Sequence, residues 1–137
     1  MAYAIEPLGT VLTVGSASFC VSSIGSIGVD GGEPLDATCL SNTEWMTKLP
    51  ATLKEATDLN FTVKFEPADW DAIVAEVNVN QSCTLNFASP LGTLTFWGYL
   101  RTFTPNEAGV GEVWEATCVI VVTNMNGSNV ETAPSYA

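Results

Sequence analysis

One stretch, residues 57–77, decides the fold class and has the sequence TDLNFTVKFEPADWDAIVAEV. In its first half, Leu59, Phe61 and Val63 alternate with polar residues, which is the two-residue period of a half-buried strand. Pro67 then suits the first turn of a helix, where its missing N–H costs nothing. The apolar positions that follow recur with helical spacing and are expected to pack on the sheet: Trp70, Ile73, Val74 and Val77.

The rest of the chain predicts strands and loops. Strands are expected at residues 10–14, 17–24, 35–40, 82–87, 93–103 and 112–123. We expect a glycine-rich loop at about 25–34, an irregular segment at 41–56 with a helical turn around Trp45, and a mobile polar tail at about 124–137. The 137 residues therefore predict a single domain, mostly β, built as a β-sandwich or barrel with one flanking α-helix.

The charge balance argues against one class of partner. Fifteen Asp and Glu residues against four Lys and Arg residues give a net charge of −11. Because phosphate binding needs clustered Lys and Arg, a protein that grips nucleic acid is disfavoured. Charged residues make up only 14% of the chain and hydrophobic residues 47%. This composition suits equally a subunit that hides surface in an assembly and a soluble β-sandwich with a hydroxyl-rich surface.

The sequence offers little for catalysis or metal binding. It has no histidine, no GxSxG nucleophile elbow and no phosphate-binding GxxxxGK[ST] loop. Its four cysteines are widely spaced without a CxxC pair, so we expect core thiols. Asp30, Glu33 and Asp36 could suggest a calcium site, but their spacing matches no EF-hand loop. We therefore expect no enzymatic activity, no metal and no cofactor.

The order of the segments carries a resemblance. The glycine-rich loop precedes LDATCL at 35–40, and LPATLKEA at 49–56 leads into the strand and helix of the opening stretch. Later, TLTFWGYLRTFTP at 93–105 carries Phe-x-Gly and ends in Phe-x-Pro, and a closing strand follows at 114–123. From about residue 36 to 123, this order resembles the tail tube (major tail) proteins of long-tailed bacteriophages. Unlike family members with an added C-terminal domain, this chain is expected to end in a short tail.

The resemblance implies a structural virion protein. Members of the family form hexameric rings that stack into a hollow tube, in which one sheet from each copy closes into a continuous inner β-barrel. The tube conducts the genome from capsid to cell. The expected partners are further copies of the chain and other tail proteins (tape measure, tail tip and terminator), and double-stranded DNA passes without specific binding. No membrane association is expected, and the protein is assembled in the host cytoplasm and located in the virion tail.

Two groups of residues are then candidates for this role. Leu35, Ala37 and Cys39 are expected to face the core of the sandwich, so that the polar residues between them face away from it. The lumen-facing candidates on this basis are Asp36, Thr38, Ser82, Thr84 and Asn86. The candidates for an inter-ring loop are Gly25, Ile27, Gly28, Asp30, Gly31, Gly32 and Glu33.

Two other interpretations stay open at this stage. One is a monomeric β-sandwich module that binds a ligand through exposed tryptophans. The other is a capsid decoration protein or a secretion-tube protein, which shares the β-rich, non-enzymatic profile.

Overall fold

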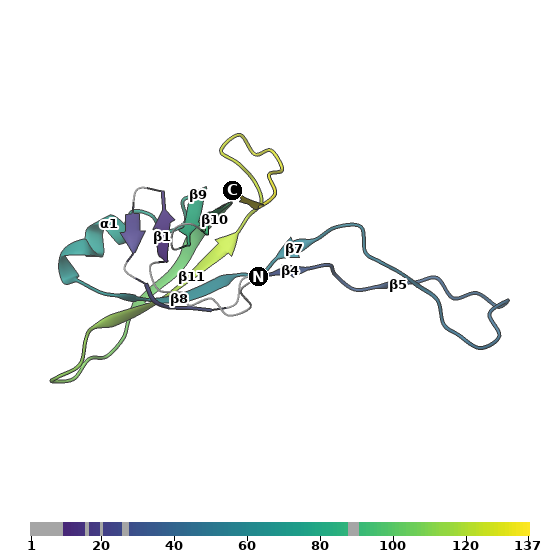
Figure 1. The fold of residues 1–137 in the computed structure, drawn as a ribbon, viewed down its shortest axis with the longest axis horizontal. Coiled ribbons are helices and arrows are strands. Elements are labelled where there is room, and N and C mark those ends of the chain that lie inside the picture. The colour runs from purple at the N-terminus through teal and green to yellow at the C-terminus, as the bar shows by residue number, and fades with distance from the viewer. Residues whose placement is uncertain (1–9, 16, 20, 26–27, 88–90) are drawn as a thin grey trace.

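One antiparallel sheet forms the body of the molecule. The computed structural model describes residues 10–137, apart from positions 16, 20, 26–27 and 88–90. The strands of the sheet are β1 (Val11–Val14), β2 (Ala17–Phe19), β3 (Val21–Ile24), β8 (Leu59–Lys64), β9 (Gln81–Asn86), β10 (Thr93–Pro105), β11 (Glu115–Val122) and β12 (Ser135–Tyr136). Their order is β2-β1-β9-β10-β11-β8-β3, with β12 beside β10. The predicted class, mostly β with one short helix, is confirmed (Figure 1).

The sheet curls so that its two ends meet. β2 and β3 stand at opposite ends of the strand order, yet only one position separates them in the sequence. Two successive Cα–Cα steps of about 3.8 Å hold the Cα atoms of Phe19 and Val21 within about 7.6 Å of each other. Across this junction, the rings of Phe19 and Phe61 meet edge to face with centroids 5.6 Å apart. One curled sheet, rather than two stacked sheets, therefore encloses the core in the described part of the chain.

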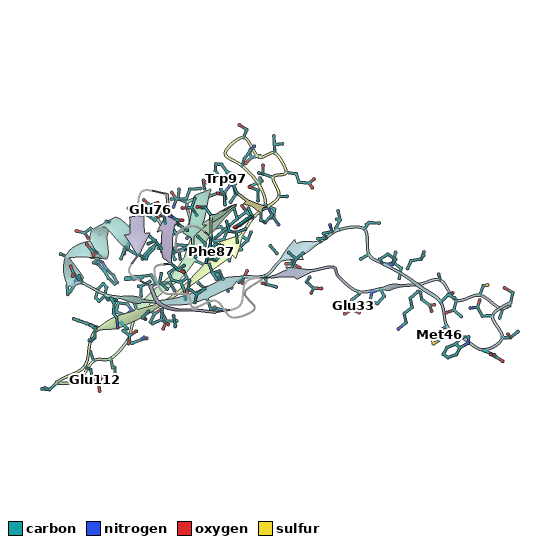
Figure 2. The ribbon with its side chains drawn as sticks, viewed as in Figure 1. Glu33, Met46, Glu76, Phe87, Trp97 and Glu112 are labelled. Atoms are coloured by element: carbon teal, nitrogen blue, oxygen red, sulfur yellow. The ribbon has the colours of Figure 1, made fainter. Side chains whose placement is uncertain are left out.

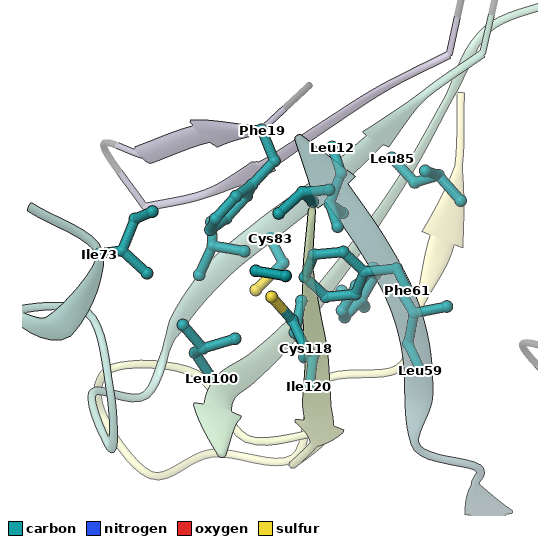
Figure 3. Close-up of a cluster of buried hydrophobic side chains, with 14 of the residues drawn as sticks. Leu12, Phe19, Leu59, Phe61, Ile73, Cys83, Leu85, Leu100, Cys118 and Ile120 are labelled. Atoms are coloured by element: carbon teal, nitrogen blue, oxygen red, sulfur yellow. The ribbon is translucent and has the colours of Figure 1, made fainter. Parts of the chain in front are cut away.

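The core lies inside the curl and is apolar. In the described residues it comprises Leu12, Val14, Phe19, Leu59, Phe61, Val63, Phe65, Ile73, Cys83, Leu85, Phe96, Leu100, Ala116, Cys118 and Ile120 (Figure 3). The alternation predicted for residues 59–64 is confirmed, because Leu59, Phe61 and Val63 are buried and their neighbours are not. Gly98 permits the close approach of β10 and β11, since a Cβ atom there would lie 2.6 Å from the Val121 carbonyl oxygen.

The helical segment is shorter than predicted. A 3-10 turn, Pro67–Asp69, leads into α1 (Trp70–Val74). It ends early because Val77 forms an isolated bridge with Leu100, and Asn78 takes a left-handed φ of 63°. No helix in the described residues has the length and apolar character needed to cross a membrane.

The predicted helix stripe is divided between core and surface. Ile73 is buried at 7% exposure, and Val77 packs partly against the core. Trp70 and Val74 keep 45% and 44% of their surface exposed. Trp70 still contacts the core rim, where its ring meets Phe65 at a centroid distance of 6.4 Å. The segment is thus anchored mainly through Ile73.

The C-terminal segment differs from the free tail expected at residues 124–137. Its end forms β12, where Tyr136 pairs with Leu94 and Ser135 with Thr95. The backbone N–H and carbonyl groups of Thr93 and Ala137 exchange two hydrogen bonds of 2.9 Å. β12 occupies the stretch of the β10 edge that β11 leaves unpaired, and these backbone bonds hold the segment to the sheet.

The division of the helix stripe predicts unequal mutational costs. Ile73→Ala removes a buried side chain and should lower the free energy of unfolding by about 2–4 kcal/mol. Val74→Ala, one position along, should change it by no more than about 0.5 kcal/mol, because that side chain lies on the exposed side of the helix with 44% of its surface in solvent. Denaturant unfolding followed by circular dichroism measures both values. Equal losses for the two variants would contradict this assignment of the buried face.

Candidate assembly arm and channel face

A long hairpin arm, residues 28–57, extends from the body (Figure 1). At its root, β4 (Val29–Asp30) pairs with β7 (Glu55–Ala56), and farther out β5 (Leu35–Asp36) pairs with β6 (Lys48–Leu49). Thr57 closes the root: its N–H donates to the Gly28 carbonyl (2.8 Å), and its Oγ1 accepts from the Gly28 N–H (2.9 Å). These short ladders hold the arm in one extended shape.

The arm exposes apolar side chains along its whole length. They are Val29, Leu35, Leu40, Trp45, Met46, Leu49 and Leu53. Trp45 is 79% exposed, and the labelled Met46 lies near the far end of the arm (Figure 2). A two-stranded hairpin is at best marginally stable in water, and exposed apolar clusters mark interaction sites. The arm therefore has the properties of a surface that is covered by a partner.

Asn42 organises the tip of the arm. Its backbone N–H donates to the Cys39 carbonyl (3.0 Å), its Oδ1 accepts from the Cys39 N–H (3.3 Å), and its Nδ2 donates to the Trp45 carbonyl (2.7 Å). Just before the tip, the Thr47 N–H donates to Thr38 Oγ1 at 3.0 Å. The helical turn expected around Trp45 does not form, because these bonds build a hairpin tip instead. The Trp45 backbone is fixed while its ring stays in solvent.

The strand expected at residues 35–40 is wrong in extent and in environment. Only Leu35–Asp36 is a strand, and Leu35, Ala37 and Cys39 are exposed instead of facing a core. The alternation is real, but β5 belongs to the arm, where no second layer covers either face. Asp36 and Thr38 consequently lie on the arm, away from the main sheet.

Asp36 forms a local turn with Thr38. The backbone N–H of Thr38 donates to Asp36 Oδ1 at 2.9 Å. This bond, with a further one from the Thr38 hydroxyl, holds the pKa of the Asp36 carboxyl below its usual range. Across the hairpin, Asp36 pairs in register with Lys48, so opposite charges face each other.

The predicted glycine loop forms the approach to the arm and one side of its root. Gly28, Asp30, Gly31, Gly32 and Glu33 lie at this root, and Asp30 Oδ1 accepts from the Gly32 N–H at 2.9 Å. Gly25 lies against β8 instead, where its N–H donates to the Asn60 carbonyl at 2.6 Å. Ile27 lies outside the described residues.

The remaining lumen candidates share one outward face of β9. Cys83 and Leu85 point into the core, so Ser82, Thr84 and Asn86 point away from it. Thr84 is the second in a row of four hydroxyl residues that runs across β1, β9, β10 and β12: Thr13, Thr84, Thr95 and Ser135.

This hydroxyl row belongs to a face without charge. Residues 11–14, 81–86 and 93–100, which form β1, β9 and the first part of β10, contain no Asp, Glu, Lys or Arg, and Arg101 follows at the bulge of β10. Two residues along the strands, Thr93 Oγ1 donates to Asn86 Oδ1 at 3.1 Å. The result is a hydrated, neutral surface on an otherwise acidic chain. Sequence reasoning missed Thr13, Thr93, Thr95 and Ser135, although the alternating threonines at 93 and 95 were a signal.

The described cysteines fall into two classes. Cys39 is exposed at the arm tip, whereas Cys83 and Cys118 are buried, so the core-thiol prediction is wrong for the first and confirmed for the other two. The Ser41 hydroxyl, 2.8 Å from Cys39 Sγ, lowers the pKa of Cys39 from its ordinary value. Burial raises the pKa of Cys83 and of Cys118 to about 12.

Comparison with known proteins gives similarity in structure but not in sequence. No family model matches the chain, and no curated protein matches it. A chain in the virion of a native gene transfer agent particle shares the fold with a TM-score of 0.67 and 11% identity, over 98% of this chain and 99% of the other. A chain from the tail of the empty particle, solved with C6 symmetry, gives 0.66 and 12% over the same shares.

A third solved structure is a component of an injection system. A chain from the PVC sheath/tube terminator of an extracellular contractile injection system, in its extended state, gives a TM-score of 0.68 and 11% identity over 89% of this chain and 94% of the other. These neighbours are structural components of particles rather than enzymes. The resemblance to tail tube proteins is therefore confirmed at the level of the fold, a mostly β chain with an antiparallel sheet and one short helix.

The two classes of cysteine predict selective labelling. Since the pKa of Cys39 is lowered, its alkylation rate should reach half of its maximum at a lower pH than that of an ordinary thiol. Cys83 and Cys118 should stay unmodified until the protein unfolds. Peptide mass spectrometry after timed iodoacetamide treatment separates the sites. Ser41→Ala should move the Cys39 midpoint to higher pH, and labelling of Cys83 as fast as Cys39 would contradict the burial.

Proposed function

We propose that this chain is a tail tube subunit: hexameric rings of it stack into a hollow tube that serves as a conduit for genome delivery. One observation carries the proposal. The chain folds into one curled sheet around an apolar core, yet it extends an arm whose apolar side chains, Trp45 foremost, are exposed in the described part of the chain. Structures with the same fold belong to particle tails, one of them with C6 symmetry, which supports a ring of this order.

In this proposal the arm joins successive rings. It projects beyond the body, so its apolar surface becomes buried only when another layer of subunits covers it. The root residues Gly28–Glu33 and the arm residues Asp36 and Thr38 then belong to contacts between rings. Asp36 and Thr38 are thereby reassigned from the lumen to the arm, because no strand connects them to the main sheet.

The outward face of β1, β9 and β10 lines the channel in this arrangement. Its hydroxyl and amide groups, with Ser82, Thr84 and Asn86 at the centre, would keep the wall hydrated. DNA phosphates find no Lys or Arg partner on β1, on β9 or on residues 93–100 of β10, and the acidic subunit repels them at longer range. Arg101, farther along β10, is the one basic residue on these three strands. Double-stranded DNA would therefore pass without binding. Sheets of neighbouring subunits would close into one inner barrel, which removes their exposed edges.

The proposed location is the virion tail, after assembly in the cytoplasm of the host. Copies of the chain itself are the main partner, and other tail proteins would bind the first and last rings. A second candidate, a tube of a contractile injection system, is favoured by the match to the sheath/tube terminator. The two candidates share the tube and differ in the particle to which the tube belongs.

Removal of the arm tests the assembly role. Asp30 and Glu55 lie opposite each other in the root ladder, so residues 31–54 can be replaced by Asn-Gly, a favoured two-residue hairpin turn. We expect a folded body with unchanged circular dichroism that forms no tubes in electron micrographs, whereas the full chain forms tubes. Long tubes from the armless variant would contradict an inter-ring role for the arm.

A charge placed on the hydroxyl row tests the channel face. Thr84→Lys should leave tubes intact but make them retain double-stranded DNA at low salt, with release as salt rises, since counterion release drives phosphate binding. Ala72→Lys adds the same charge on exposed α1 and is the matched control. Co-sedimentation of tubes with DNA measures retention. Equal retention by both variants would place Thr84 outside the channel.

A further inference from the structure

A small apolar pocket opens at the root of the arm. It has a volume of about 180 Å³ and lies between the arm strands, the start of β10 and the end of β11. The pocket is lined by one glycine and six apolar residues: Gly28, Val29, Ala56, Leu94, Phe96, Val122 and Pro134. An apolar cavity of about 150 Å³ binds benzene. This pocket is therefore the right size for one aromatic ring and offers no polar group to a charged ligand.

We propose that the pocket receives the Trp45 side chain from the arm tip of a second copy of this chain. Among the apolar residues of the tip, Trp45 is the one whose backbone carbonyl is held, by the Asn42 amide at 2.7 Å. A fixed backbone and a side chain with few rotamers lower the entropy lost on docking, and tryptophan is enriched among the residues that anchor protein interfaces. This inference rests on the proposed tube.

The pocket cannot be filled by its own arm. Ala56 lines the pocket and Trp45 lies eleven positions earlier in the sequence, which is roughly 35 Å along an extended strand at about 3.3 Å per residue. The paired ladders β4–β7 and β5–β6 keep the arm extended, as Figure 1 shows. The Trp45 side chain of the same copy therefore cannot reach the pocket, so a Trp45 occupant has to come from a second copy of the chain.

Such a contact is heterologous, because the tip of one copy meets the root of the next and the relation repeats. One tryptophan side chain in one pocket is a weak contact. A hexameric ring presents the contact once per subunit, so that the contacts between two rings act together by multivalency. Free subunits would then stay apart while rings stack.

Two complementary variants test the proposal. Trp45→Ala removes the tryptophan side chain and leaves the pocket open. Ala56→Leu fills the pocket and leaves the tryptophan side chain in place. Each should raise the critical concentration for tube formation by at least about tenfold, the effect of an interface anchor. Val110→Ala, at an exposed apolar position outside the arm, and Ala72→Leu, on exposed α1, are the matched controls and should polymerise like wild type. If Ala56→Leu fails to fold, Gly28→Leu fills the same pocket, since a Cβ there comes no closer than 3.8 Å to Thr57 Oγ1.

Mixing the two variants gives the decisive result. The Trp45 side chain of the Ala56→Leu variant can enter the unfilled pocket of the Trp45→Ala variant, but no further contact follows. The mixture should therefore form pairs of hexameric rings and no tubes, as seen by electron microscopy and sedimentation. Tubes from Trp45→Ala at the wild-type concentration, long tubes from the mixture, or no ring pairs in it would each overturn the proposal. A block by Ala56→Leu alone would mean that another segment fills the pocket, which also overturns it. If the wild-type chain itself forms neither rings nor tubes, the proposed function fails as well.

Discussion

The fold depends on a single constraint, the shared origin of the two sheet ends. Residues 17–24 supply both β2 and β3, so the first and last strands of the hydrogen-bonded order cannot separate by more than the span of one residue. The sheet has to curl, and its concave side becomes a closed apolar interior in which Phe19 and Phe61 meet. The polar side chains that alternate with this core, such as Ser82, Thr84 and Asn86 on β9, face outward. The neutral face is therefore a consequence of the curl.

The core could be predicted from the sequence because its signal is local. Alternation at 59–64 identified the buried side of β8, and the same pattern marked Cys83 and Leu85 on β9. The same pattern at 35–40 led to a wrong prediction of a buried face. Alternation indicates an extended backbone, but it does not show whether another layer of the protein covers one side of it. In the arm the backbone is extended and paired, but no layer lies beneath Leu35.

The candidate site was predictable only in part, for reasons of sequence distance. Thr13, Thr84, Thr95 and Ser135 are aligned solely by strand register, which no local pattern encodes. Likewise, β12 is two residues long, and its pairing with Leu94 and Thr95 depends on the edge that β11 leaves free. Ser82, Thr84 and Asn86 were found because they alternate with buried neighbours on one strand.

The pocket lies at the root of the arm and Trp45 lies at its tip, and this separation has a consequence for how the tube would grow. A polymer joined by tip-to-root contacts is polar: its leading terminus displays free tryptophan-bearing tips and its trailing terminus displays empty pockets. A protein that starts the polymer and one that stops it must then be chemically different, the one supplying a surface for apolar tips and the other an apolar plug. Directional assembly would follow from the shape of the subunit alone, without any separate device to specify which way the structure points.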